Sequence, residues 1–307
     1  MAQPRVNGWF TRKAALAQGI GWRTLNGPEY RRLFHGVYAR SACLDLDKVA
    51  ALAGIAGANN PRALASHHSA ATLWGGVVPS IFDIHVTVPA GMTTLRPQGL
   101  VVHSAERAAA RRRGVPVTSA ADTFVDMARY LGLVDLVVLG DSLVQSSGLP
   151  PTKLSEAAAR SSGRNVRLAR RAAALVRPGV DSSMETRSRL LIVLAGLPEP
   201  SVNYVFRDAG GDIRRRLDMA YVKARLAIEY DGRQHADSTA QWHEDVVRRE
   251  EFDGLGWRLV VLHGRDVYRT PQHTIDRLIQ AMRERGMHIP PLRQEWREHF
   301  GHSGSPT

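Results

Sequence analysis

The sequence has almost none of the features that mark disulfide-stabilised, secreted or membrane-spanning proteins. Its 307 residues include one cysteine, Cys43, so no intramolecular disulfide can form and a Cys/His zinc pattern is excluded. No run approaches the roughly 18 apolar residues of a membrane-spanning helix, and residues 1–19 lack the apolar core of a signal peptide. A lone cysteine suits a reducing compartment. We therefore expect a cytoplasmic protein without a membrane partner.

Acidic residues are in short supply relative to basic ones. The chain has 41 Lys and Arg against 29 Asp and Glu, a net charge of +12 and a pI near 10.6. This excess favours an anionic polymer, nucleic acid and DNA in particular, as the partner. A generally basic protein without such a partner is the alternative. The hydrophobic content of 44% is ordinary for a globular protein, and the length suffices for two domains.

Acidic side chains nevertheless gather in one predicted β-hairpin, residues 214–230. Two apolar runs flank a polar turn there, which is typical of a hairpin. If Tyr221 and Leu226 are the last paired residues, Asp218 lies opposite Glu229. Directly opposed carboxylates repel each other and destabilise a hairpin. Such a pair therefore indicates a role outside the hairpin's own stability.

The same register pairs Arg216 with Asp231 and places all four charged side chains on one face. A hard cation such as Mg²⁺ binds one or two carboxylates together with water and phosphate oxygens. This face consequently predicts a metal site for phosphodiester chemistry. The alternative is a solvated edge strand on which Arg216 and Lys223 neutralise the acids.

The predicted elements around the hairpin follow the order α-β-β-β-α-β-α. They are a helix at 180–197, a strand at 202–206, the hairpin, a helix at about 239–255, a strand at 257–262 and a helix at about 273–285. The motif residues are IEYDGRQH at 228–235, Arg248 or Arg249, Leu255 and GWRLV at 256–260. On these residues the segment from about Asp181 to Arg285 resembles the PD-(D/E)XK nuclease superfamily, and more closely its very-short-patch-repair-like branch.

This resemblance implies roles for several residues. Asp218 and Glu229 correspond to the two metal-binding acids, and Glu185 to the acid of the first helix; the implied cofactor is Mg²⁺ or Mn²⁺. Asp231 stands where the superfamily has a lysine, and it could be a further ligand or fix the tautomer of His235. His235 is then the best candidate general base, since imidazole titrates near neutral pH. Water activated by the metal could also serve unaided.

The weaker candidates have simpler alternatives. His235 could be a histidine of a surface turn, and Glu185 could pair with Arg189 on an exposed helix face. Arg248 and Arg249 could belong to a solvated helix face, although one of them matches an arginine of the family and would contact phosphate.

The amino-terminal region predicts a helix at 11–18, a second short helix at 21–26 and a basic β-ribbon at 31–39. The motifs that follow are GVYA at 36–39, SHHSAATLWG at 66–75, IHVTVP at 84–89 and VPVTSAADTFVDMAR at 115–129. On these residues the region resembles the winged-helix regulators of the AbiEi antitoxin type, which implies binding to DNA. The candidate DNA contacts are Arg23, Arg31, Arg32 and Arg40.

Two features qualify this half of the chain. Gly27-Pro28 interrupts the expected recognition helix, so the arginines could grip phosphates without reading sequence, or the winged helix could serve only for docking. His67 and His68 look like metal ligands, but the sequence offers no second ligand pair at suitable spacing. They are therefore interpreted as a helix start.

Together these patterns predict an α/β (α+β) protein. The expected parts are a winged helix at 1–45, an α+β domain at 46–148, a basic helical linker at 149–178, a restriction-endonuclease-like αβββαβ domain at 179–290 and a tail at 291–307. The basic run at 111–113 predicts an exposed loop.

The favoured function is a Mg²⁺-dependent DNA endonuclease or nickase in defence or repair. One alternative is a non-catalytic DNA-binding transcriptional regulator or antitoxin-like protein with a degenerate nuclease fold. A third possibility is that the carboxy-terminal half is a protein-interaction module.

Overall fold

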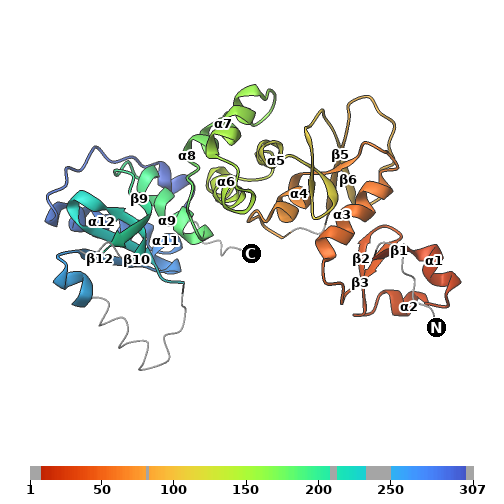
Figure 1. Cartoon of the computed structure of the whole chain (residues 1–307), viewed down its shortest axis with the longest axis horizontal. Helices are drawn as coiled ribbons and strands as arrows, with labels where there is room; N and C mark the ends of the chain where they lie inside the picture. Colours follow the sequence, from red (N-terminus) through yellow and green to blue (C-terminus); the bar gives the residue numbers. More distant parts are fainter. Residues whose placement is uncertain (1–7, 81–82, 208–212, 233–249, 302–307) are drawn as a thin grey trace. The chain divides into compact units, whose positions relative to one another are not determined.

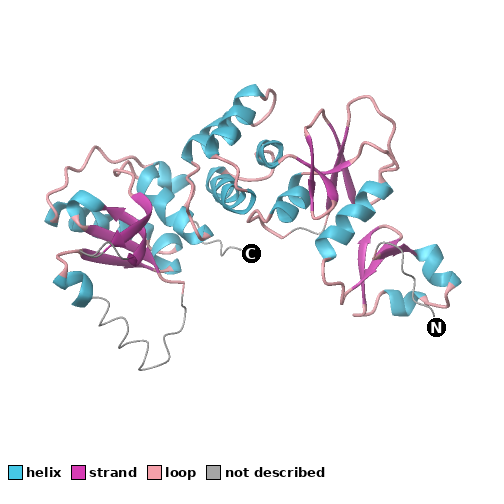
Figure 2. Cartoon of the chain, in the orientation of Figure 1, coloured by secondary structure: helices cyan, strands magenta, loops and turns pink. Residues whose placement is uncertain are grey.

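The computed structural model describes residues 8–80, 83–207, 213–232 and 250–301. The chain divides into two compact units, unit 1 at Met1–Val176 and unit 2 at Arg177–Thr307. Both combine helices with sheets (Figures 1 and 2), so the expected α/β (α+β) class is confirmed. Among the described residues, no helix has the length and apolar character that crossing a membrane would require.

Unit 1 begins with a small three-stranded sheet and two short helices. The elements are β1 (Trp9–Thr11), α1 (Arg12–Ala17), α2 (Trp22–Leu25), β2 (Tyr30–Phe34) and β3 (Val37–Arg40), with the strand order β1-β3-β2. Thr11 caps α1, because its hydroxyl accepts a hydrogen bond from the Ala14 N–H at 3.2 Å. Helix α2 ends before Gly27-Pro28, as Pro and Gly predict. The expected helices and basic ribbon are thus confirmed as local elements.

A five-stranded mixed sheet forms the centre of unit 1. Its strands are β4 (Leu64–Ala65), β5 (Ile84–Val88), β6 (Leu100–Ser104), β7 (Ala109–Arg112) and β8 (Val115–Thr118), in the order β6-β5-β4-β8-β7. Helices α3 (Leu46–Gly57) and α4 (His67–Trp74) pack on the sheet, and α5 (Ala120–Met127) and α6 (Leu133–Ser147) pack on α4. Strand β5 is buried along its whole length. Burying each such aliphatic side chain contributes about 1.5–3 kcal/mol to stability.

The sequence suggested an exposed loop at 111–113; Arg111 and Arg113 are exposed, but Arg111 and Arg112 belong to strand β7. Strand β7 pairs antiparallel with β8, and Arg113 occupies the turn with a φ of 49°. The Arg112 guanidinium lies 5.4 Å from the centre of the Trp74 ring. This cation–π contact and the strand pairing explain why the run is ordered.

The segment at 149–178, expected to be a basic helical linker, is helical as expected, but it packs as part of unit 1. It forms α7 (Pro151–Arg160) and α8 (Val166–Leu175), which pack on α5 and α6 through buried residues such as Leu154. The Arg170 guanidinium donates hydrogen bonds to the carbonyls of Ala158, Ala159 and Ser161 at the end of α7. Capping carbonyls with a cation stabilises a helix terminus, so this arginine has a structural partner.

Unit 2 is built on a four-stranded sheet in the order β12-β11-β10-β9. Its elements are α9 (Ser183–Leu194), β9 (Ser201–Arg207), β10 (Ile213–Tyr221), a 3₁₀ turn (Val222–Ala224), β11 (Leu226–Tyr230), β12 (Arg258–Leu262), α11 (Gly264–Tyr268), α12 (Pro271–Glu284) and a second 3₁₀ turn (Glu295–Glu298). Strands β9 to β11 are antiparallel, whereas β11 and β12 are parallel. Helix α9 packs on β10 and β11. Most of the helix expected at 239–255 lies outside the described residues.

The expected tail at 291–307 is partly a packed segment. Trp296 and Phe300 are buried, and the Arg293 N–H donates to the Ala195 carbonyl at 2.8 Å at the end of α9. Two aromatic side chains bury enough apolar surface to hold an otherwise irregular segment in place. Residues 291–300 therefore belong to unit 2.

Candidate functional site

The hairpin of unit 2 has the register that the sequence predicts. Tyr221 pairs with Leu226, and Met219 pairs with Ile228. The 3₁₀ turn and Arg225, whose φ of 49° is left-handed, reverse the chain between the two strands. One further step along this register places Asp218 beside Glu229. The register prediction is confirmed for the paired residues.

The Asp218 carboxylate lies across the hairpin from β10 onto β11. Its Oδ2 accepts a hydrogen bond from the Tyr230 N–H at 2.8 Å, so the acid reaches the backbone next to Glu229. Glu229 itself is only 4% exposed, because β11 is a central strand flanked by β10 and β12. A buried carboxylate is costly unless a cation or hydrogen-bond donors accompany it. The structure therefore places two acids together at the middle of the sheet.

Glu185 approaches the same place from the first turn of α9. Its N–H donates to the Ser182 hydroxyl at 3.1 Å, and its Oε2 accepts from the Asp181 N–H at 3.1 Å. These bonds form the start of the helix and fix the direction of the carboxylate. Burial raises the pKa of Glu185, and the negative charge of Asp218 raises it further. The two side chains are thus close enough to interact electrostatically.

The alternatives considered for these acids fit the structure less well. Arg189 is fully buried, and its Nη1 donates to Glu199 Oε1 at 3.0 Å, so it does not lie on an exposed helix face with Glu185. Arg216 Nη1 lies 3.8 Å from Asp181 Oδ2, in an exposed ion pair at the start of α9. Such a pair contributes only about 0–1 kcal/mol.

Asp231 follows β11 at the carboxyl end of the parallel pair β11–β12. Its N–H donates to the Leu262 carbonyl at 2.8 Å. Its own carbonyl lies 3.2 Å from Nδ1 of His263, the first residue after β12. His263 was not among the candidates from the sequence. A histidine directly after an apolar strand, at the carboxyl edge of a parallel pair, is the signal that would have found it.

Three candidates lie outside the described residues: His235, Arg248 and Arg249. The four candidate DNA contacts of unit 1 are all exposed: Arg23 on α2, Arg31 and Arg32 on β2, and Arg40 at the end of β3. The basic ribbon therefore presents arginines that solvent and phosphate groups can reach.

The donor set of unit 2 fits a hard divalent cation. Asp218, Glu229 and Glu185 offer only carboxylate oxygens, the ligand type that Mg²⁺ and Mn²⁺ prefer. Burial is the main cause of the raised pKa of Glu185, and the Asp218 charge adds to it; a cation would relieve the repulsion between these two acids.

Comparison with known proteins bears on both units. The restriction-endonuclease-like family model REase_MTES_1575 matches residues 202–282, from β9 into α12. It includes Asp218, Glu229, Asp231 and His263 and leaves Glu185 outside. The resemblance of unit 2 to nucleases is thereby confirmed, whereas the resemblance of unit 1 to antitoxin regulators stays a prediction.

Two proteins of Mycobacterium tuberculosis match much more of the chain. They are uncharacterized protein MT2308 of strain CDC 1551 / Oshkosh and uncharacterized protein Rv2248 of strain ATCC 25618 / H37Rv. Each is 30% identical over 256 residues, which cover 82% of this chain and 92% of the relative. A match of this length includes much of unit 1 as well as unit 2, so the two units occur together in these relatives.

Proposed function

Because the chain belongs to one family with the M. tuberculosis proteins MT2308 and Rv2248, and unit 2 matches a restriction-endonuclease-like model, we propose that it is a metal-dependent DNA endonuclease or nickase. In this proposal unit 2 hydrolyses a phosphodiester bond, and unit 1 holds the protein on DNA. A physiological role in defence or repair would suit such an activity.

The observation that carries the proposal is the pair of acids in the hairpin of unit 2, where the Asp218 carboxylate reaches the backbone beside buried Glu229. Burial raises the pKa of Glu185, and the charge of Asp218 raises it further, so Glu185 lies within electrostatic reach of this pair. Repulsion between these carboxylates lowers the stability of the fold. Its presence therefore favours a role for the acids in binding a cation or in catalysis.

Asp218 and Glu229 would hold Mg²⁺ or Mn²⁺, with Glu185 beside them. When bound, the ion supplies Lewis-acid stabilisation of the negative charge that develops on the phosphate. Glu185 is positioned by its bonds at the start of α9, so it can orient a water molecule without moving.

His263 is a candidate proton acceptor at the Asp231 end of β11. Its side chain accepts a hydrogen bond from the Asp266 N–H in the capping box of α11, and its Nδ1 lies 3.2 Å from the Asp231 carbonyl. These two contacts hold the ring in place, and its unprotonated nitrogen would take a proton from water, which is the task the superfamily lysine assists. His235 is the second candidate, on the strength of the motif alone.

Contacts from unit 1 would add affinity without sequence specificity. The exposed arginines Arg23, Arg31, Arg32 and Arg40 can neutralise backbone phosphates. Because α2 has only four residues, Trp22–Leu25, it offers little surface for reading bases in a major groove.

The proposal is tested by incubating the full-length chain with supercoiled plasmid DNA and Mg²⁺ or Mn²⁺. Wild type should nick or cut the plasmid, and chelation should stop it. The double variant Asp218→Ala with Glu229→Ala should lose cutting while still binding DNA. A matched control, Asp253→Ala with Asp276→Ala, removes two exposed acids from the same unit and should cut like wild type. Undiminished cutting by the first variant would refute the assignment.

A non-catalytic DNA-binding regulator is the second candidate function. Asp231 in place of the superfamily lysine favours it, since loss of that lysine is a step towards a degenerate site. In that case DNA binding would be independent of divalent metal, no cutting would occur, and the protein would repress its own promoter.

A further inference from the structure

Four histidines meet in unit 1, far in sequence from the acids of unit 2. His67 and His68 begin α4, His85 lies on β5 and His103 on β6. Strands β5 and β6 are parallel, with His85 opposite Val101 and Thr87 opposite His103. Residues two apart on a strand share a face, so His85 and His103 project from the same side of the sheet as diagonal neighbours. The second pair of ligands that the sequence did not reveal is therefore supplied by two adjacent strands.

The nitrogens of three of these rings converge. One ligand atom each from His67, His85 and His103 lies within 4.8 Å of the others. Nδ1 of His85 is 3.0 Å from Nε2 of His103, and the rings of His67 and His103 stack with centroids 3.6 Å apart. Imidazole ligands of a tetrahedral Zn²⁺, each about 2.0–2.1 Å from the ion, have nitrogens about 3.3 Å apart. The closest pair, at hydrogen-bond distance, comes within about 0.3 Å of this spacing.

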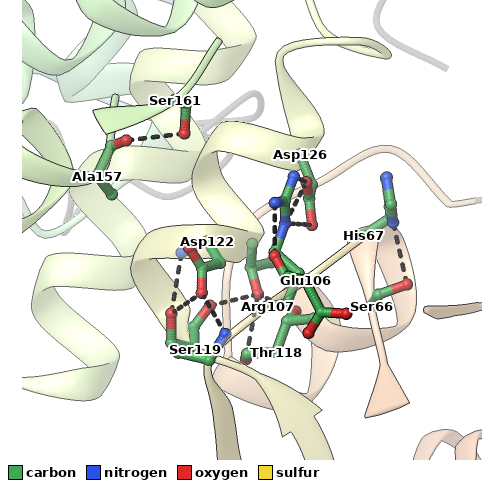
Figure 3. A network of polar contacts seen from close by, with 12 residues as sticks. Ser66, His67, Glu106, Arg107, Thr118, Ser119, Asp122, Asp126, Ala157 and Ser161 are labelled. Carbon is green, nitrogen blue, oxygen red and sulfur yellow. Dashed lines mark hydrogen bonds and ion pairs between the residues drawn. The ribbon is translucent and has the colours of Figure 1, made fainter. Parts of the chain in front are cut away.

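The backbone and a hydrogen bond hold His67 in an unusual position. Its φ of 49° is left-handed, which is strained for a residue with a Cβ. Its Nδ1 lies 3.0 Å from the Ser66 hydroxyl, and Figure 3 shows the other ring nitrogen turned away from Ser66. A partner on one imidazole nitrogen that orients the other is the usual support of a metal-binding histidine.

A second layer of contacts fixes the surroundings of the cluster. The Tyr130 ring stands edge-on to all four histidines. Arg107 forms a forked ion pair with Asp126 of α5, at 3.0 and 3.2 Å from Nε (Figure 3). This pair anchors the segment just after β6, which carries His103. The nearby Arg96 is held by the Val102 carbonyl at 2.9 Å, while Arg129 is exposed.

Burial keeps these imidazoles neutral. Desolvation, together with the neighbouring histidines, lowers the pKa of His67 to about 2 and that of His85 to about 3. Desolvation, with Arg129 and Arg96, lowers the pKa of His103 to about 4. At neutral pH each ring therefore has a lone pair that no proton occupies, which is the form that binds a metal.

Two buried polar atoms near the cluster have no hydrogen-bond partner among the described residues. They are Nδ1 of His68 and Oγ1 of Thr87, the residue opposite His103. Buried polar atoms are usually hydrogen-bonded in folded proteins, so these two atoms would be partners for a water molecule bound beside the cluster.

We propose that His67, His85 and His103 form a binding site for a borderline divalent transition-metal ion, Zn²⁺ in the first place. Three neutral imidazoles suit Zn²⁺, Co²⁺ and Ni²⁺ and are poor ligands for Mg²⁺. Binding would require the His67 ring, which is stacked on His103, to tilt so that its nitrogen points at the ion. Three protein ligands leave one tetrahedral position for water, and partly exposed His103 gives that position access to solvent.

The test uses tag-free full-length protein stripped of metal. Zn²⁺ binding is measured by calorimetry and Co²⁺ binding by visible absorption, in a background with Asp218→Asn and Glu229→Gln so that unit 2 cannot contribute. One Zn²⁺ should bind per chain, Co²⁺ should show a tetrahedral spectrum, and a large excess of Mg²⁺ should not compete. Absence of Zn²⁺ and Co²⁺ binding would overturn the proposal.

Matched variants identify the ligands. His85→Phe and His103→Phe keep an aromatic ring for stacking and remove the nitrogens, so each should weaken Zn²⁺ binding at least 100-fold. His68→Phe removes a neighbouring ring of the same burial and should change the affinity less than about threefold. Melting curves of the metal-free proteins check folding, and Zn²⁺ should raise the melting temperature of His68→Phe but not of His103→Phe. Equal losses in all three variants would overturn the three-ligand set.

Discussion

Unit 1 and unit 2 each gather ionisable side chains inside a mixed sheet, but they gather opposite chemistries. Unit 2 brings together carboxylates, and burial with the Asp218 charge raises the pKa of Glu185. Unit 1 brings together imidazoles, and burial lowers the pKa of His67, His85 and His103. In both cases the neutral form is favoured, which is the signature of desolvation.

The two sets of ligand atoms differ in the ion that they prefer. Carboxylate oxygens are hard ligands that suit Mg²⁺, whereas imidazole nitrogens suit Zn²⁺ and its neighbours. The two proposed metal sites would therefore not compete for the same ion.

The largest expected effect is a double dissociation between the two sites. Asp218→Asn should reduce Mg²⁺-dependent DNA cutting by about 10³-fold, because it removes an anionic ligand, and should leave Zn²⁺ binding within twofold. His103→Phe should abolish Zn²⁺ binding and leave DNA binding unchanged. Plasmid cleavage and calorimetry measure both quantities on the same preparations. Loss of Zn²⁺ binding in Asp218→Asn would remove the distinction between the sites.

The next effect concerns the ion pair that supports the histidine cluster. Arg107→Ala should lower the free energy of unfolding by about 3–5 kcal/mol, because Asp126 is buried and would lose its cationic partner. Urea unfolding of the full chain measures it.

The exposed pair of unit 2 gives the control for that measurement. Arg216→Ala breaks the contact with Asp181, whose side chains are 59% and 47% exposed, so the expected loss is only about 0–1 kcal/mol. Equal losses for the two variants would show that burial does not distinguish the pairs.

A smaller effect is acid sensitivity of the metal-free protein. His67 is neutral in the fold down to about pH 2, whereas the unfolded chain protonates it near pH 6.5. The unfolded state then binds more protons between these values, so this contribution to stability is complete above pH 6.5 and declines as the pH falls. The expected slope is about 1.4 kcal/mol per pH unit for this residue. The free energy of unfolding, measured in chelator from pH 7 to pH 5, should depend less on pH in His67→Phe than in wild type. An unchanged pH dependence would contradict the assignment.

The smallest effect concerns the basic ribbon of unit 1. Arg31→Ala and Arg32→Ala should each weaken DNA binding about equally for all sequences and reduce the salt dependence by about one phosphate contact. Fluorescence anisotropy at several salt concentrations measures the slope. Arg293→Ala, at the packed end of unit 2, is the control and should leave the salt dependence of DNA binding unchanged.

Local patterns predicted much of both folds. The Thr11 cap, the end of α2 before Gly27-Pro28 and the hairpin register at Tyr221–Leu226 follow from short-range rules of capping, helix breaking and strand alternation. The linker role predicted for 149–178 was wrong because its many arginines suggested a solvated helix. The small residues of the same helices form a face that packs on α5 and α6.

The two candidate sites also differ in how far short-range rules predict them. Asp218 and Glu229 stand on strands joined by a short turn, so counting residues across the turn was enough to bring them together. His85 and His103 stand on parallel strands, whose pairing depends on a crossover, and no local turn sets that register. His263 was missed for this reason as well, since β12 reaches β11 only through the sheet.

The amino-acid sequence establishes the chemistry available in each unit: a basic chain, acids at fixed spacing in a hairpin, and histidines spread from residue 67 to residue 103. Only folding brings those histidines together and pairs Arg107 with Asp126. Hairpin register is set by neighbours along the chain, whereas parallel pairing and buried ion pairs depend on the packing of the whole sheet.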